Sequence, residues 1–209
     1  MPKSLRTMLF IGALVAWSGL ALQFWVSSSL FAARGKSVLE TLSRMLAYFT
    51  ILTNLVVAGY YSIRLVASAS SAARWLAQPP VGSAIAMYVT LVCVIVHLIL
   101  RHLQVLTGNA FLADTILHYV TPILFVVFWI GWVPKRSLQW RHALWWALYP
   151  LAYFGYAMVR GAGSGFYPYP FIDVGELGYP HVLLNASLLV VAFLILMAVF
   201  IALNHRRPH

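Results

Sequence analysis

The chain has 209 residues, of which 62% are hydrophobic and only 9% carry a charge. Its mean hydropathy of +0.85 lies far above that of soluble globular domains, so water cannot be its main solvent. A net charge of +10 would suggest nucleic-acid binding in a soluble protein, but here the basic residues stand in short connections between apolar runs. We therefore expect an all-α polytopic membrane protein and no nucleic-acid partner.

Six apolar stretches are long enough to cross about 30 Å of hydrocarbon, which takes about 20 helical residues. Pro79-Pro80, Pro134 and the run 161–170 mark the connections between them. The first stretch is longer than the apolar part of a signal peptide, which indicates an uncleaved span. We predict one transmembrane domain over residues 1–209, a six-helix bundle with spans near 8–31, 42–66, 82–104, 112–133, 142–160 and 180–204.

Charged residues are divided unevenly between alternate connections. With a cytoplasmic N-terminus, the outside segments hold all four acids, Glu40, Asp114, Asp173 and Glu176, together with Arg34, Lys36, Arg44, Arg101 and Arg160. The inside segments hold no acid and nine basic residues, Lys3, Arg6, Arg64, Arg74, Lys135, Arg136, Arg141, Arg206 and Arg207. Because cytoplasmic loops carry an excess of Lys and Arg, this pattern predicts that both termini are cytoplasmic.

Polar side chains recur at helical spacing inside the predicted spans, where ionisable groups are costly and become functional candidates. Spans two, four and six begin outside and span three ends there, so these side chains converge on the outer leaflet, and Arg160 and Asp173 come from loops on that face. The candidates within the spans are Thr50 and Asn54 in span two, His97, Arg101 and Gln104 in span three, Asp114, His118 and Thr121 in span four, and Asn185 in span six.

Such a group suits nucleophilic acyl transfer, because a hydroxyl becomes a good nucleophile when a neighbouring histidine takes its proton. Thr50 and His118 fit these roles, and Asp114, one turn before His118, could orient the ring. Asn54 or Arg101 could donate to an oxyanion. His97, Arg160, Asp173 and Asn185 complete the supporting set. Structural hydrogen bonding is the alternative interpretation of the threonine, asparagine and histidine residues, whereas Arg101, Asp114 and Arg160 lie near span ends and could extend to the membrane interface. Thr53 competes with Thr50 for the nucleophile role.

Four strings carry a resemblance to a known family. They are YFTILTNL at 48–55, LHYVTPILF at 117–125, YPLAYFGYAMVRG at 149–161 and GFYPYPFIDV at 165–174. They resemble the Pr-six-Pr family of small bacterial multi-span proteins over most of the chain from residue 45 to residue 185. This resemblance implies a multi-pass protein of the bacterial inner membrane.

More remotely, the chain is similar to the family of the animal androgen-induced protein and the androgen-dependent TFPI-regulating protein, six-span hydrolases of fatty acid esters of hydroxy fatty acids. The threonine of that family lies in an aromatic context that matches Tyr48-Phe49-Thr50, and its histidine precedes a polar pair and a proline, as His118 precedes Thr121-Pro122. A later string matches Tyr169-Pro170-Phe171. The similarity implies Thr50 as nucleophile and His118 as base. Where the animal proteins have an amide one turn before the histidine, this chain has Asp114.

The leading hypothesis is therefore a membrane-embedded lipid esterase that takes an acyl-ester lipid from the outer leaflet and needs no metal or cofactor. Membrane lipids are its expected partners, and no protein partner can be predicted. A non-enzymatic transporter or small-molecule binding protein is the alternative, although polar residues are scarce in the inner halves of the spans. A third possibility is a redox protein in which His97 and His118 ligate haem.

Overall fold

The structure is a computed structural model that describes residues 1–103 and 105–206, so the predicted Gln104 and Arg207 lie outside the described residues. The chain is all-helical, with 82% of its residues in helices and no strand in the described part. It divides into two compact units, Met1–Pro134 (unit 1) and Lys135–His209 (unit 2). The prediction of one transmembrane domain over the whole chain stays a prediction.

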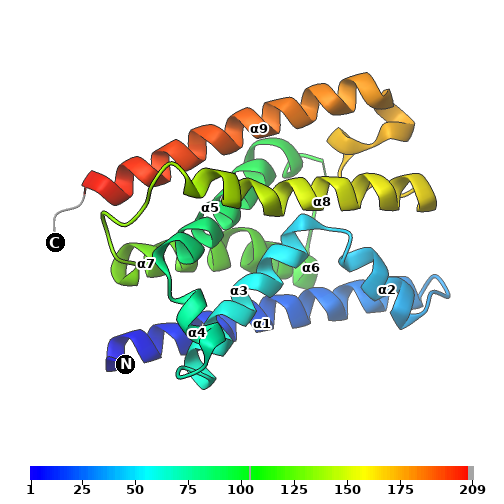
Figure 1. The fold of residues 1–209 in the computed structure, drawn as a ribbon. Coiled ribbons are helices and arrows are strands. Elements are labelled where there is room, and N and C mark those ends of the chain that lie inside the picture. Colours follow the sequence, from blue (N-terminus) through cyan, green and yellow to red (C-terminus); the bar gives the residue numbers. More distant parts are fainter. Residues whose placement is uncertain (104, 207–209) are drawn as a thin grey trace. The chain divides into compact units, whose positions relative to one another are not determined.

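Unit 1 is a bundle of long helices with two short ones (Figure 1). The helix α1 packs against α3 and against the segment formed by α6, η2 and α7, while α5 packs against α3 and α7. Two short π-helical turns, η1 and η2, continue α5 and join α6 to α7. The bounds are α1 (Lys3–Ala32), α2 (Val38–Met45), α3 (Phe49–Val66), α4 (Ser71–Leu76), α5 (Pro79–Ile95), η1 (Val96–Leu100), α6 (Gly108–Thr115), η2 (Ile116–Val120) and α7 (Thr121–Trp132).

An aromatic cluster fills the centre of unit 1. The Phe125 ring centroid of α7 lies 5.2 Å from that of Tyr60 and 5.3 Å from that of Tyr61, and all three side chains are buried. Such tilted and edge-to-face pairs add stabilisation beyond the burial of their area. On the neighbouring pair of helices, Trp129 Nε1 donates to Ser83 Oγ at 2.7 Å, a buried hydrogen bond that joins α7 to α5.

Two glycines of α1 allow the helices around it to approach closely. A Cβ at Gly12 would lie 2.5 Å from the Tyr61 ring, and one at Gly19 would lie 2.6 Å from Ile116 Cγ2. Small residues serve this purpose in membrane helices, because packing rather than the hydrophobic effect drives helix association in lipid. The glycine at position 19 therefore lets η2 lie directly against α1.

Unit 2 consists of α8 (His142–Ser164), the short 3-10 helix η3 (Pro170–Ile172) and α9 (Val174–Arg206), and η3 packs against α9. Gly178 interrupts α9 with φ 72° and ψ 160°, a conformation that glycine adopts at little cost. At the far end, the buried Asn204 Oδ1 accepts from the amides of Ser137 and Leu138 at 3.1 and 3.2 Å. The loop after Pro134 thereby covers the carbonyl end of α9.

Among the described residues, five helical segments are long and apolar enough to cross a membrane: Lys3–Ala32, Phe49–Val66, Pro79–Leu100, Gly108–Trp132 and Val174–His205. These lengths and compositions are those of a helical membrane protein. The expected fifth span, 142–160, forms the 23-residue α8 but is not among the five. Its many Trp, Tyr and Gly residues make it less apolar than a run of Leu, Ile and Val.

Several expected boundaries differ from the structure: the first span begins at Lys3 rather than 8, the third ends at Leu100 rather than 104, and the fourth begins at Gly108 rather than 112. The span expected over 42–66 begins only at Phe49, because α2 ends at Met45 and Tyr48 has the extended backbone of a helix N-cap. The span expected to begin at 82 already begins at Pro79, since a proline in the first helical turn lacks only an N–H that would be unpaired there. The last helix begins at Val174 and is broken near the expected start at 180.

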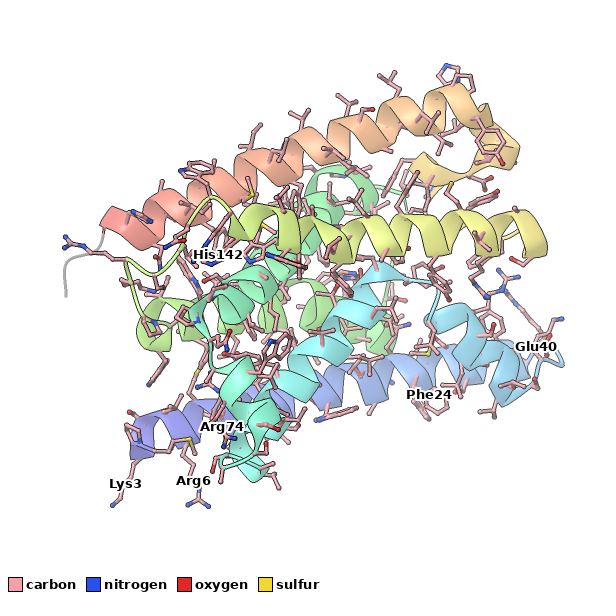
Figure 2. All side chains as sticks on the ribbon, in the orientation of Figure 1. Lys3, Arg6, Phe24, Glu40, Arg74 and His142 are labelled. Carbon is pink, nitrogen blue, oxygen red and sulfur yellow. The ribbon has the colours of Figure 1, made fainter. Side chains whose placement is uncertain are left out.

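Charged side chains are separated along unit 1. Figure 2 shows Lys3, Arg6 and Arg74 in the half of this unit where α1 begins, and Glu40 near the end where α1 finishes. All four side chains are exposed, as is usual for charges at the ends of membrane helices. The predicted division of charges between the two sides of the membrane stays a prediction.

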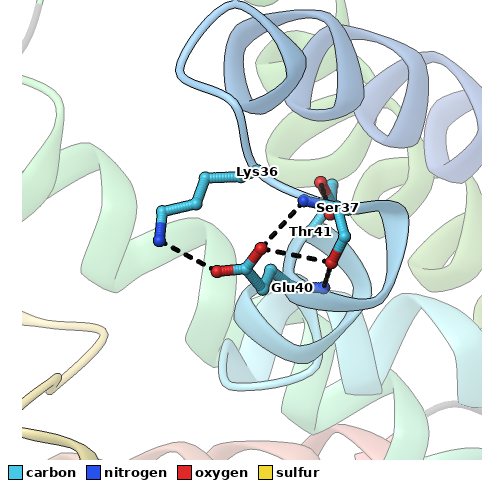
Figure 3. Close-up of polar contacts among 4 residues, drawn as sticks. All are labelled: Lys36, Ser37, Glu40 and Thr41. Atoms are coloured by element: carbon cyan, nitrogen blue, oxygen red, sulfur yellow. Dashed lines mark hydrogen bonds and ion pairs between the residues drawn. The ribbon is translucent and has the colours of Figure 1, made fainter.

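The short α2 begins with a capping box, in which Ser37 Oγ accepts from the Glu40 amide at 3.2 Å and Glu40 Oε2 accepts from the Ser37 amide at 2.8 Å (Figure 3). Lys36 Nζ lies 2.9 Å from the other carboxylate oxygen. The Ser37 amide, followed by the Lys36 ammonium, lowers the pKa of Glu40 from 4.5 to about 2. The charged carboxylate is therefore part of the cap.

We expect α2 to lose its cap in acid. Because the pKa of Glu40 is lower in the folded chain than its ordinary value, the stabilisation is complete above about pH 4.5 and is lost as the pH falls towards 2. A carbon-13 titration of the Glu40 carboxyl group and the Cα shifts of α2 would follow this change together. Lys36→Gln should raise the titration midpoint of Glu40 only part of the way to 4.5, because the Ser37 amide still lowers the pKa. A wild-type midpoint near 4.5 would show that the carboxylate is not part of the cap.

We also expect Asn204→Ala to destabilise unit 2, because it leaves the Ser137 and Leu138 amides without their side-chain acceptor. Unsatisfied buried groups of this kind cost about 1–3 kcal/mol each. Thermal unfolding in detergent micelles should show a clear decrease in Tm. Asn204→Asp keeps an accepting oxygen and is the matched control, so equal losses in the two variants would contradict this role.

Candidate functional site

Thr50 is the second residue of α3 and lies where the chain turns into this helix. Tyr48 before it has an extended backbone with φ −88° and ψ 129°, and it forms the N-cap without a side-chain cap hydrogen bond. The Thr50 side chain is buried, with 6% of its surface exposed. Thr50 therefore lies in the first turn of α3, at the N-terminal end of the helix.

His118 lies in η2, the π-helical turn between α6 and α7. The Thr121 amide donates to the carbonyl of Ile116, five residues back, as in a π-helix. The sequence reason is Pro122, since in a regular α-helix its ring would clash with the carbonyl four residues earlier, that of His118. Widening the helix by one residue relieves this clash, and such π-bulges are frequent at functional sites.

The structure brings the threonine and the histidine into contact. His118 Nε2 lies 3.3 Å from Thr50 Oγ1, although 68 residues separate the two in the sequence. On the other side of the ring, His118 Nδ1 lies 2.7 Å from Asp114 Oδ1 and 3.0 Å from the Asp114 carbonyl oxygen. A carboxylate and a carbonyl can only accept hydrogen bonds, so Nδ1 carries the proton. Nε2 is therefore free to accept the Thr50 hydroxyl proton.

Asp114 and His118 are less deeply buried than the threonine. Their side chains are 26% and 16% exposed, so the pair is mostly buried but still reaches the surface. The i, i+4 spacing on one helical segment places the carboxylate directly beneath the ring. The order hydroxyl, imidazole and carboxylate is that of a hydrolase triad.

Asn54 lies one turn after Thr50 and is almost fully buried, with 1% of its surface exposed. Its Nδ2 donates to the Thr50 carbonyl at 2.9 Å and to the Leu117 carbonyl of η2 at 3.2 Å. An amide nitrogen has only two protons, so these bonds leave none of them for an oxyanion. The geometry does not favour the predicted role of Asn54 as an oxyanion donor.

The residues predicted for span three, His97 and Arg101, form no hydrogen bond with Thr50, His118 or Asp114 in the described part of the chain. His97 is exposed on η1, and its ring centroid lies 6.2 Å from that of Tyr119, the neighbour of His118. Arg101 is exposed directly after η1, where its amide donates to the Val96 carbonyl. Their supporting roles stay predictions.

The remaining predicted residues belong to unit 2. Asp173 Oδ1 accepts from the amides of Gly175 and Glu176 and so caps the beginning of α9. Asn185 Nδ2 donates to the Phe171 carbonyl at 2.9 Å, which ties η3 to α9. These are structural contacts within the unit, and a catalytic part for Asp173, Asn185 or Arg160 stays a prediction.

No metal site emerges from residues 1–103 and 105–206, where no group of three or more His, Cys, Asp or Glu side chains could hold an ion. Haem ligation by His97 and His118 does not fit the geometry either. Both ring nitrogens of His118 are engaged, one by Thr50 and one by Asp114. An iron ligand would need one of these nitrogens free.

No known family model matches the sequence, and neither a curated protein nor a solved structure matches the chain. The interpretation of the site therefore depends on which side chains are in contact. Sequence reasoning paired Thr50 with His118 but missed the π turn and the two donor bonds of Asn54. The Thr-Pro pair three residues after the histidine was the available signal for the π turn.

We expect Asp114→Asn to weaken the preference of His118 for a proton on Nδ1. The amide can present N–H instead of oxygen to the ring, while the residue 114 carbonyl still accepts from Nδ1. Nitrogen-15 spectra of the histidine side chains should show a mixture of tautomers instead of one. A variant that keeps the wild-type spectrum would contradict the orienting role of the carboxylate.

Proposed function

We propose that this chain is an integral-membrane lipid ester hydrolase, with Thr50 as the nucleophile, His118 as the general base and Asp114 as the residue that orients the imidazole. The observation that carries the proposal is the 3.3 Å contact between Thr50 Oγ1 and a ring nitrogen whose tautomer makes it a proton acceptor. A hydroxyl needs such a base to attack an ester near neutral pH.

In the first half of the reaction, Thr50 Oγ attacks the ester carbonyl carbon while its proton moves to His118 Nε2. The tetrahedral intermediate then collapses, the bond to the alcohol oxygen breaks, and the proton passes from Nε2 to that oxygen. The products of this half are a free alcohol and an acyl group on Thr50. Asp114 stabilises the imidazolium that forms between the two proton transfers.

In the second half, water attacks the acyl-threonine carbonyl and gives a proton to His118 Nε2. Collapse of this intermediate returns the proton to Thr50 Oγ and releases the carboxylic acid. Water enters and the alcohol leaves where Asp114 and His118 are partly exposed. No redox step and no cofactor is needed for this cycle.

The negative charge on the intermediate oxygen needs hydrogen-bond donors. We assign this part to the backbone amide of Ile51, the residue after the nucleophile, which lies in the first turn of α3. Amides at a helix N-terminus have no carbonyl partner within the helix and carry its positive dipole end. This assignment replaces the amide of Asn54, both of whose protons bond to carbonyl oxygens.

The membrane setting supports a lipid substrate. We infer a six-span protein of the bacterial inner membrane, in which α8 is the additional span and both termini are cytoplasmic, because the acids stand in the connections opposite to the purely basic ones. In that orientation Thr50 and His118 lie in the outer leaflet, where an acyl-ester lipid can diffuse in laterally. The resemblance to intramembrane threonine hydrolases points to the same chemistry.

We expect purified protein in lipid nanodiscs to be labelled at Thr50 by a fluorophosphonate probe and to hydrolyse members of a lipid-ester panel. Thr50→Ala should abolish labelling, and His118→Gln should lower kcat by about 10³-fold or more, because each removes a member of the reacting pair. Mass spectrometry of the labelled peptide identifies the residue.

Thr53→Ala is the matched control, since Thr53 is a buried threonine on the same helix. This variant should keep its label at Thr50, and loss of the label in Thr53→Ala, or a label on Thr53 in the wild-type protein, would show that the nucleophile was assigned wrongly. Folded wild-type protein without labelling and without turnover would overturn the esterase proposal. Solute flux that persists in Thr50→Ala would then favour the transporter alternative.

A further inference from the structure

The side chain of Asn54 joins the two backbone segments that carry the proposed reacting groups. One Nδ2 proton goes to the carbonyl of Thr50 itself, and the other goes to the carbonyl of Leu117, the residue before His118. Rotating the amide by half a turn would point Oδ1 at two carbonyl oxygens, which repel it, so the donor orientation is determined by its surroundings. Asn54 therefore spans α3 and η2 at the depth of the site.

The Leu117 carbonyl has a particular need for this donor. In an α-helix it would accept from the amide of residue 121, but the Thr121 amide is committed to Ile116 in the π turn. The next amide along the helix would be that of residue 122, which is a proline and has no N–H. Leu117 is buried, and an unpaired carbonyl in an apolar environment is costly. Asn54 supplies the missing donor from another helix.

We propose that Asn54 is the positioning residue of the Thr50–His118 pair, an inference that rests on the proposed esterase function for its catalytic consequence. Its amide holds the first turn of α3 and the π turn η2 at a constant separation, and this separation sets the distance from Thr50 Oγ1 to His118 Nε2. The bond to Thr50 fixes the amide within α3, and the bond to Leu117 forms only where η2 lies beside it. Asn54 does not touch the substrate in this role.

The environment of the Asn54 side-chain oxygen is consistent with a positioning role. Oδ1 is buried and has no hydrogen-bond partner in the described part of the chain. A polar atom left in this state is a cost that the two donor bonds to Thr50 and Leu117 have to offset. An apolar residue of similar size would avoid that cost but would leave the Leu117 carbonyl unpaired.

The test measures the pairing directly. Protein with nitrogen-15 histidine is placed in nanodiscs, and the His118 Nε2 resonance is assigned by its loss in His118→Gln. Thr50→Val removes the hydroxyl at nearly constant shape and gives the position of the resonance without the Thr50 contact. In Asn54→Ala we expect the resonance to move towards its position in Thr50→Val. We also expect fluorophosphonate labelling to slow by about 10- to 100-fold, as for a misplaced reacting group.

Asn54→Thr is the second variant, in case the alanine variant does not fold. A threonine hydroxyl in a helix donates to the carbonyl four residues back, here that of Thr50, and loses only the bond to Leu117. It should show the same direction of shift in the Nε2 resonance. Ser83→Ala is the control for loss of stability, because it breaks the buried bond from Trp129 between α5 and α7 of the same unit. It should leave the resonance and the labelling rate unchanged.

The outcomes separate the two proposals. If folded Asn54 variants keep the wild-type resonance and labelling rate, or if Ser83→Ala moves them equally, the positioning role is overturned. If wild-type protein is not labelled and has no esterase activity, the proposed function fails, while the resonance still decides whether Asn54 sets the Thr50–His118 contact.

Discussion

Inside a membrane, every backbone N–H and C=O group must find its partner within the protein, and a helix supplies most of these partners. The regular pairing is interrupted in η2, where Pro122 removes one donor and displaces another. The carbonyl of Leu117 is left without a helical partner, and Asn54 of α3 supplies one. The carbonyl that the π turn leaves unpaired thus forms a hydrogen bond between η2 and α3, next to the contact of Thr50 with His118.

The close packing around this point depends on α1. Gly19 leaves room for Ile116, so η2 lies directly against the backbone of α1. About two turns earlier in α1, Gly12 leaves room for the ring of Tyr61. Further along α3 from Thr50, the aromatic cluster of Tyr60, Tyr61 and Phe125 holds α3 and α7 together. Hydrogen bonds set the positions of the Thr50 and His118 side chains. Small residues and aromatic rings set the distances between the helices that carry these side chains.

The same accounting of hydrogen bonds explains the polar residues of unit 2. Asp173 caps the first amides of α9, and Asn204 accepts from two loop amides at the other end. Asn185 holds the carbonyl of Phe171. A list of intramembrane polar residues therefore mixes two kinds, those that complete a helix end and those that could act on a substrate. Only the contacts separate them.

The sequence by itself predicted the all-helical class, five of the six apolar segments and the pairing of Thr50 with His118 as candidates, because apolar length and helical spacing are local properties of the chain. It misplaced the beginning of α3, since the α2 cap and the turn before Thr50 do not change the run of apolar residues. The Thr50–His118 distance, the tautomer of the ring and the two donor bonds of Asn54 required the tertiary structure. They depend on how residues more than 60 positions apart pack, and on which carbonyl Pro122 leaves unpaired, and neither follows from spacing along a helix.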